Sequence, residues 1–176
     1  MAVTAPQVLF QNRKPDRIAT LDEYRHSGGY QALSEALQKG SPGEVVQKVV
    51  DANLQGRGGA GFPAGLKWKS VAAHFPFPRY VVTNIDEMEP GTFKDRIMAH
   101  ADPHMIIEGT ALAGYAVSAQ IGIIFVRPSY ESSAIILERE IQIARDAGYI
   151  SPETFQTLYD LAGRTKRKIS AFKATL

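Results

Sequence analysis

Glycine is concentrated in one short stretch near the middle of the chain. Residues 56–65 read GRGGAGFPAG and contain five glycines. Because glycine loses more backbone freedom on folding than any other residue, such a stretch is costly to order and cannot build a core. Its bare amides can, however, close around an anionic or flat ligand without interference from side chains. We therefore predict a ligand cradle here, with a tight structural turn as the alternative.

Acidic side chains gather in a second stretch. Residues 84–96 read NIDEMEPGTFKDR and bring together Asp86, Glu87 and Glu89. Carboxylates this close repel one another unless a partner or a function holds them. The preceding residues 79–84 form an apolar, β-branched run typical of a buried strand, and ligands bind at the carboxyl ends of parallel strands. We interpret the acidic stretch as part of the same site; a turn in which Asn and Asp bond their own backbone is the alternative.

Two common phosphate-binding motifs do not fit the glycine stretch. Residues 56–61 satisfy G-x-G-x-x-G, but residues 45–54 before them have helical spacing, whereas the dinucleotide-binding motif follows a strand. A P-loop is excluded because Lys67 is followed by Trp68, where Ser or Thr would hold magnesium. We therefore predict a ligand cradle that belongs to neither of these two motifs.

Metal and nucleophile chemistry find little support in the sequence. The chain has no cysteine, which excludes disulfides and thiolate metal sites. His104 and Glu108 stand four residues apart on an expected helix, but no third ligand accompanies them, and we interpret them as surface or cap residues. No Ser/His/Asp or Cys/His constellation stands out, so we predict no catalytic side chain and no metal site.

Helical and strand patterns surround the two stretches. Ser41-Pro42-Gly43-Glu44 is a capping box with proline at the first helical position, so a helix is expected to deliver the chain to the glycine loop. The expected elements, in order, are a short strand at 8–10, helices at 21–25, 30–39, 42–53 and 63–73, a strand at 79–84, a helix at 103–119, a strand at 121–127, and helices at 130–147 and 151–161. Strand, helix and strand at this spacing form a βαβ unit with a parallel sheet.

These elements predict the fold class. We expect an α/β, Rossmann-like three-layer fold, a parallel sheet with helices on both faces, preceded by a short helical N-terminal segment. We divide the chain into an N-terminal arm with helices (1–55), a partial ligand-binding α/β domain (56–150) and a helical basic tail (151–176).

Composition narrows the class of protein further. The chain has 176 residues, of which 44% are hydrophobic and 22% are charged, which suits one domain with a real core. The net charge of +2 is too small to argue for nucleic acid, and we interpret the basic run 164–168 as a solvated end rather than a nucleic-acid or acidic-partner tail. No apolar run has the length of a membrane span and no signal pattern opens the chain, so we expect a cytoplasmic protein without direct membrane insertion.

The two stretches together resemble a known family. G-R-G-G-A-G-F-P-x-G-L-K-W followed by N-x-D-E-x-E-P-G-T-F-K-D-R is similar to the flavin-binding subunit of NADH dehydrogenases. That family includes the 51 kDa subunit of respiratory complex I and its relatives in NAD-linked hydrogenases and formate dehydrogenases. The resemblance runs from about residue 21 to about residue 148, and we expect the tail after residue 150 to be unlike the family.

The resemblance implies flavin mononucleotide (FMN) and NADH as cofactors. It carries FMN contacts onto Gly56, Arg57, Gly58, Gly59, Lys67, Asn84, Asp86 and Glu87, and NADH contacts onto Phe62 and Glu89. From the residues alone, Lys67 could equally be a solvated helix charge and Phe62 a core residue. Arg57 could pair with the acidic stretch.

The resemblance also implies a reaction and partners. Hydride would pass from NADH to FMN, and electrons onward to iron–sulfur centres of a multi-subunit oxidoreductase, with a 2Fe-2S small subunit as neighbour. Such a complex could dock on the cytoplasmic face of a membrane. The family's own 4Fe-4S cluster lacks ligands here.

Several features depart from the family. Residues 127–130 read RPSY where the family has R-G-E-Y, and the later acidic segment that completes the pocket is missing. Half a pocket binds weakly, because contacts are lost while the ordering cost remains. We therefore expect an NADH dehydrogenase family member that is inactive as a lone chain. The alternative is a non-catalytic remnant that serves as an assembly or interaction module.

Overall fold

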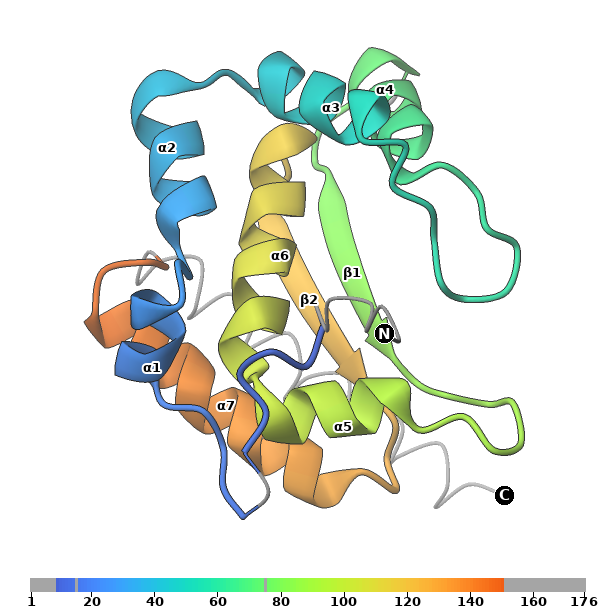
Figure 1. The fold of residues 1–176 in the computed structure, drawn as a ribbon. Helices are drawn as coiled ribbons and strands as arrows, with labels where there is room; N and C mark the ends of the chain where they lie inside the picture. Colours follow the sequence, from blue (N-terminus) through green and yellow to red (C-terminus); the bar gives the residue numbers. More distant parts are fainter. Residues whose placement is uncertain (1–8, 15, 75, 151–176) are drawn as a thin grey trace, which may run out of the picture.

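The computed structural model describes residues 9–14, 16–74 and 76–150, and it has the expected α/β architecture (Figure 1). Its elements, in order, are α1 (Leu21–His26), α2 (Gln31–Lys39), α3 (Pro42–Asp51), α4 (Ala64–His74), β1 (Tyr80–Ile85), α5 (Lys94–Ala101), α6 (Pro103–Ala116), β2 (Ile121–Val126) and α7 (Glu131–Asp146). No helix in these ranges is long and apolar enough to cross a membrane. The expected helix at 151–161 lies outside the described residues.

Local capping explains where the N-terminal helices begin. The predicted capping box at Ser41 is present, with its hydroxyl accepting from the Glu44 amide and the Glu44 carboxylate accepting from the Ser41 amide. A second box, formed by Thr20 and Glu23 before α1, was not predicted. The expected short strand at 8–10 is not formed at residues 9 and 10, which lie in a turn; residue 8 is outside the described ranges.

The two strands pair in parallel and confirm the predicted βαβ unit. Tyr80 pairs with Ile121 at one end of the ladder and Ile85 with Val126 at the other. Helix α6 lies along the sheet in Figure 1, and Thr83 of β1 lies 2.7 Å from Thr110 of α6, hydroxyl to hydroxyl. Both strands therefore end at the same edge, which is where the acidic stretch begins.

The opposite face of the sheet is open in the described part of the chain. Tyr80, Val82 and Phe125 point away from α6 and remain 50%, 59% and 49% exposed. The side chains that face α6, among them Ile85 and Ile124, belong to a cluster that also includes Leu137 of α7. Within the described ranges, α6 and α7 thus cover the same face, and the predicted second helical layer is not observed there.

One helix was not predicted. The sequence indicated a single helix between the two strands, whereas the structure has two, α5 and α6, separated at Asp102. The predicted start of a helix at Asp102-Pro103 is confirmed, because the Asp102 carboxylate accepts from the Met105 amide at 3.4 Å. Helix α5 lies at the end of the acidic stretch, and its first turn is capped from outside itself, as described below.

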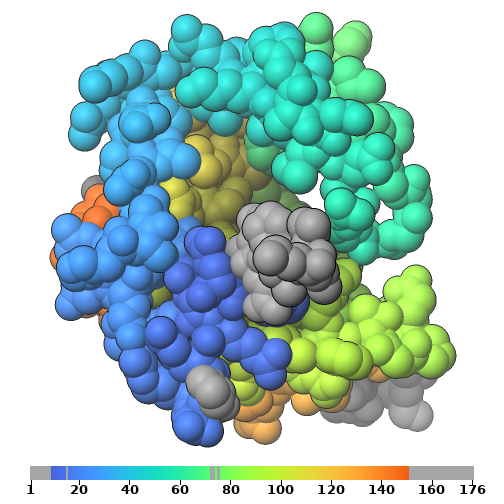
Figure 2. Space-filling view, viewed as in Figure 1, coloured from blue at the N-terminus to red at the C-terminus, as the bar shows by residue number. Residues whose placement is uncertain are grey.

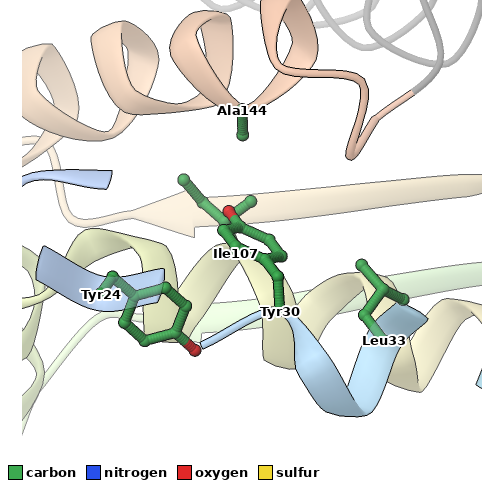
Figure 3. Close-up of a cluster of buried hydrophobic side chains, with 5 residues drawn as sticks. All are labelled: Tyr24, Tyr30, Leu33, Ile107 and Ala144. Carbon is green, nitrogen blue, oxygen red and sulfur yellow. The ribbon is translucent and has the colours of Figure 1, made fainter. Parts of the chain in front are cut away.

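The N-terminal helices dock on α6 and α7 through an aromatic cluster (Figure 3). Tyr24 and Tyr30 meet edge to face, with ring centroids 5.4 Å apart, and Ile107 and Ala144 approach them from α6 and α7. Burying aromatic side chains of this size stabilises a core more than most contacts do. Helices α1 and α2 are therefore fixed to α6 and α7.

The interpretation of His104 and Glu108 as surface residues is wrong. They are 0% and 6% exposed, because the face of α6 that carries them is covered by α1 and α2. Glu108 is nevertheless a cap: its carboxylate accepts from the Tyr30 amide at 2.7 Å and the Leu33 amide at 3.2 Å, at the start of α2. The same carboxylate accepts from the Tyr24 hydroxyl at 2.5 Å. A spacing of four residues indicates that two side chains share a helix face. It does not indicate whether other elements cover that face.

The burial of His104 predicts a pH dependence of stability. Burial lowers its pKa, against the charges of Glu140 and Asp102, which raise it; Glu140 Oε2 lies 3.1 Å from Nε2, and the Tyr30 hydroxyl 3.0 Å from Nδ1. The unfolded chain therefore binds a proton below about pH 6.5 that the folded chain resists, so the free energy of unfolding decreases as the pH is lowered through this range, by up to about 1.4 kcal/mol per pH unit.

Chemical denaturation between pH 8 and pH 5 measures the slope of the free energy of unfolding against pH. Burial raises the pKa of Asp102, which acts in the opposite direction, so the informative quantity is the difference between the wild type and His104→Gln. The variant should lose stability at every pH and show a flatter slope below about pH 6.5. His74→Gln, at an exposed position, should keep the wild-type slope. Equal slopes in His104→Gln and the wild type would contradict the assignment.

Gly65 allows α3 and α4 to approach closely. A Cβ built at Gly65 would lie 2.5 Å from the amide nitrogen and 2.8 Å from the Cα of Val50, and backbone atoms cannot rotate away. Gly65→Ala should therefore destabilise the fold by about 1–3 kcal/mol. Gly109→Ala in α6, where a Cβ meets nothing within 4 Å, should stabilise it by about 0.5–1 kcal/mol. Thermal denaturation of both variants tests the contrast, and a neutral Gly65→Ala would contradict the packing.

Candidate functional site

The glycine loop is a closed excursion between α3 and α4. Its base is an antiparallel bridge between Gln55 and Pro63, supported by a hydrogen bond of 2.9 Å from the Gly56 amide to the Phe62 carbonyl. A further bond of 2.8 Å from the Ala64 amide to the Leu54 carbonyl leads into α4. The two ends of the loop are thus held together by backbone contacts at its base, and these contacts do not involve the residues at its tip.

The tip of the loop presents unused backbone donors. Among the described residues, no hydrogen-bond acceptor meets the amides of residues 57–61, and residues 56–60 are exposed. A Cβ built at Gly58 or Gly59 would meet nothing within 4 Å, so packing does not require glycine at either position. Gly59 and Gly61 have φ values of +116° and +63°, which favour glycine. The backbone therefore requires glycine at Gly59 and Gly61, which is compatible with the ligand cradle and with the structural turn that was the alternative.

The acidic stretch follows directly from β1. Asn84 is exposed, and its Oδ1 accepts from the Asp86 amide at 3.1 Å, which is the local turn contact considered as the alternative. That contact occupies one oxygen of Asn84 and leaves its amide group available. The Asp86 Oδ1 atom is buried and has no hydrogen-bond partner among the described residues. Buried acceptors are seldom left unpaired, so this atom is a candidate for a ligand hydroxyl or an ordered water.

Glu87 is the most engaged carboxylate of the stretch. It is 5% exposed, and its two oxygens accept from the amides of Asp95 at 2.9 Å and Arg96 at 3.4 Å. It therefore caps α5, whose own N-cap residue, Phe93, supplies no side-chain acceptor. Lys94 Nζ lies 3.8 Å from Glu87 Oε1. Glu89, two residues later, is exposed.

Arg127 joins the acidic stretch from the other strand. Its Nη1 donates to the Glu87 carbonyl oxygen and lies 3.8 Å from Asp86 Oδ1. Sequence reasoning did not include this residue in the site. A signal was available, because Arg127 comes immediately after β2 and Asp86 immediately after β1, and the ends of neighbouring parallel strands meet at one edge.

The glycine loop and the acidic stretch lie on the same side of the molecule. In Figure 1 the loop between α3 and α4 and the segment between β1 and α5 both project beyond the same edge. Figure 2 shows the space-filling surface notched between them. Phe62, at the base of the loop, is 57% exposed, and Lys67 is exposed on the first turns of α4. The two stretches predicted to form the site thus lie on one side of the molecule with a notch between them, and each has unsatisfied polar groups.

This chain is similar to a known protein family, to named relatives and to solved structures. The profile of the Nuo51 FMN-binding domain matches residues 49–171, so the match continues past residue 150, into the tail expected to be unlike the family. The F subunit of the NADH-quinone oxidoreductase of Aquifex aeolicus is 42% identical over 171 residues. Its counterpart in Escherichia coli is 43% identical over 141 residues, and the HndC subunit of the NADP-reducing hydrogenase of Solidesulfovibrio fructosivorans is 35% identical over 153 residues.

The similarity covers most of this chain but a minor part of each relative. The match to the Aquifex aeolicus protein spans 97% of this chain and 40% of that protein, and the match to the Escherichia coli protein 80% and 32%. Among solved structures, an NAD⁺-reducing [NiFe]-hydrogenase in the H2-reduced state superimposes with a TM-score of 0.64 at 33% identity, covering 75% of this chain and 23% of the hydrogenase chain.

Proposed function

Because this chain belongs to the Nuo51 FMN-binding domain family, we propose that it is the FMN- and NADH-binding part of an electron-entry subunit. One observation carries the proposal: the amides of residues 57–61 have no acceptor among the described residues, and the acidic stretch lies on the same side of the molecule. Amides of this kind suit a phosphate, and carboxylate and amide oxygens suit the hydroxyls of a ribityl chain.

The residues present fit FMN at both ends. Gly56, Arg57, Gly58 and Gly59 would receive the phosphate or the flat ring, and Lys67 on α4 would add a positive charge. The Asn84 amide would donate to a ribityl oxygen, and the Asp86 carboxylate would accept from a ribityl hydroxyl. Glu87 stays in the proposed set although it caps α5, because a carboxylate has about four lone-pair sites and can accept further hydrogen bonds.

The NADH side of the site rests on two exposed residues. Phe62 is free to stack on a nicotinamide nucleotide, and Glu89 to accept from its hydroxyls. Bound FMN would supply the redox chemistry, accepting a hydride from NADH and releasing electrons singly. The protein would bind, orient and shield the two ligands, without a general base or nucleophile.

We propose that electrons would leave the flavin for centres held outside these 176 residues. This chain contains no cysteine, so it cannot hold an iron–sulfur cluster on thiolates. We propose iron–sulfur centres of a multi-subunit complex as acceptors, including those of a 2Fe-2S small subunit, and a position on the periphery of that complex. The three comparison proteins are named as oxidoreductase or hydrogenase subunits, which supports assembly into such a complex.

Flavin titration tests the proposal. Adding FMN to the purified chain should quench flavin fluorescence saturably, and NADH with ferricyanide as acceptor then reports electron transfer. Binding with slow or absent transfer would fit a site that needs the segments which the longer relatives possess. Absence of binding at millimolar FMN would refute the proposal.

The open face of the sheet favours a second function, association with another polypeptide. Tyr80, Val82 and Phe125 form an exposed apolar patch on strands. We propose as its partner the part of a flavin subunit that this chain does not match, which is 60% of the Aquifex aeolicus protein. Co-purification with a fragment comprising that part, lost on Val82→Asp, would support association; no co-purification, or binding unaffected by the change, would refute it.

A further inference from the structure

The guanidinium of Arg127 lies where both strands of the sheet end. The parallel register pairs Ile85 with Val126, so the next residue of each strand, Asp86 and Arg127, emerges at the same edge. The Arg127 amide extends the ladder by donating to the Ile85 carbonyl at 3.1 Å. The backbone of Arg127 is therefore held by the sheet, and only its side chain reaches into the acidic stretch.

The side chain of Arg127 makes two kinds of contact with that stretch. Its Nη1 donates to the carbonyl oxygen of Glu87, and the same nitrogen lies 3.8 Å from the buried Oδ1 of Asp86. The first contact holds the backbone of the turn. The second supplies a positive charge to a carboxylate oxygen that has no hydrogen-bond partner among the described residues.

The two other cations, Lys94 and Arg96, belong to the acidic stretch itself and make different contacts. Lys94 contacts Asp95 at 2.7 Å and approaches Glu87 from the α5 side. Arg96 lies over one ring, that of Tyr130, at 5.2 Å, and Arg127 lies over the same ring at 5.9 Å. Arg127 thus differs from Arg96 in its contacts to the turn rather than in its aromatic neighbour, which makes Arg96 a matched control.

We propose that Arg127 is the positioning residue of the acidic stretch. By donating to the Glu87 carbonyl and facing Asp86, it holds residues 86–89 in the conformation that keeps Asp86 beside the guanidinium and Glu87 on the amides of α5. The consequence for flavin binding rests on the proposed function. The effect on the ligand-free turn does not, so the two can be tested separately.

The ligand-free test uses hydrogen exchange. In Arg127→Met, the amides of Asp86, Asp95 and Arg96 should exchange about tenfold faster, because the turn and the Glu87 cap loosen together. Arg96→Met, which removes the other cation over Tyr130, should leave the exchange of the Asp86 and Asp95 amides unchanged. Unchanged exchange in Arg127→Met, or an equal effect in Arg96→Met, would overturn the proposal whether or not FMN binds.

The ligand test compares FMN with riboflavin, which lacks the phosphate. Arg127→Met should weaken both about tenfold with an unchanged midpoint of thermal unfolding, and Arg127→Lys should restore part of the loss, because it keeps the charge but not the forked geometry. A loss confined to FMN would mean that Arg127 holds the phosphate directly, and a loss explained by lower thermal stability would mean a purely structural role; either overturns the proposal. If the wild type binds neither flavin, the proposed function fails and hydrogen exchange alone decides the role of Arg127.

Discussion

Replacement of Gly58 by valine is expected to weaken FMN binding about 100-fold, or about 2.8 kcal/mol, while the midpoint of thermal unfolding stays within about 2 °C of the wild type. The two effects separate because a side chain at Gly58 meets nothing within 4 Å in the ligand-free protein and its φ is not in the left-handed region. The added atoms would instead occupy the space in front of the unused amides, where the ligand is proposed to lie.

A matched glycine controls for the change in composition. Gly43 is exposed at the start of α3, and a Cβ there also meets nothing within 4 Å, but it is remote from the loop tip in sequence. Gly43→Val should alter FMN affinity less than twofold. Calorimetric titration of both variants measures the affinities directly. If Gly58→Val binds FMN as the wild type does, the loop is not the cradle; if it unfolds at much lower temperature, the glycine has a structural role.

The largest loss of stability is expected from Glu108→Ala, about 4 kcal/mol, or roughly 10 °C in the unfolding midpoint. The Glu108 carboxylate meets three donors from the N-terminal helices, which are the Tyr24 hydroxyl and the amides of Tyr30 and Leu33. Alanine would leave these buried donors without an acceptor, and an unsatisfied buried donor loses its full solvation. Burial raises the pKa of the Tyr24 hydroxyl, and its hydrogen bond to Glu108 adds to the rise, so tyrosine remains the donor at neutral pH.

Two further variants separate the hydrogen bonds from helix propensity and charge. Glu138→Ala removes a glutamate from the exposed side of α7 and should change the midpoint by less than about 2 °C. Glu108→Gln keeps the size and one acceptor oxygen, and should lose about half as much as alanine. Denaturant titrations followed by circular dichroism give the free energies of unfolding. A Glu108→Ala variant as stable as Glu138→Ala would show that the network does not anchor α1 and α2.

The sequence predicted those helices and strands whose capping residues or apolar runs lie within the element or next to it. The box at Ser41 and Glu44 lies within four residues, and the apolar runs of β1 and β2 need no distant partner to be recognised. The Thr20 box was equally local and was missed. Helix α5 was missed for a different reason: its cap, Glu87, precedes it by seven residues and belongs to the turn after β1, so no start signal stands at its N-terminus.

The α/β class, the βαβ unit and the two segments that carry the candidate chemistry follow from the amino-acid sequence alone, because residue spacing and capping act over a few residues. What each charged group does became clear only in the folded chain. Glu108 is buried as a cap for α2, Glu87 is turned toward α5, and Arg127 meets a turn 40 residues earlier in the chain. Burial and pairing depend on which distant segments fold against a residue, and that information is not contained in its sequence neighbours.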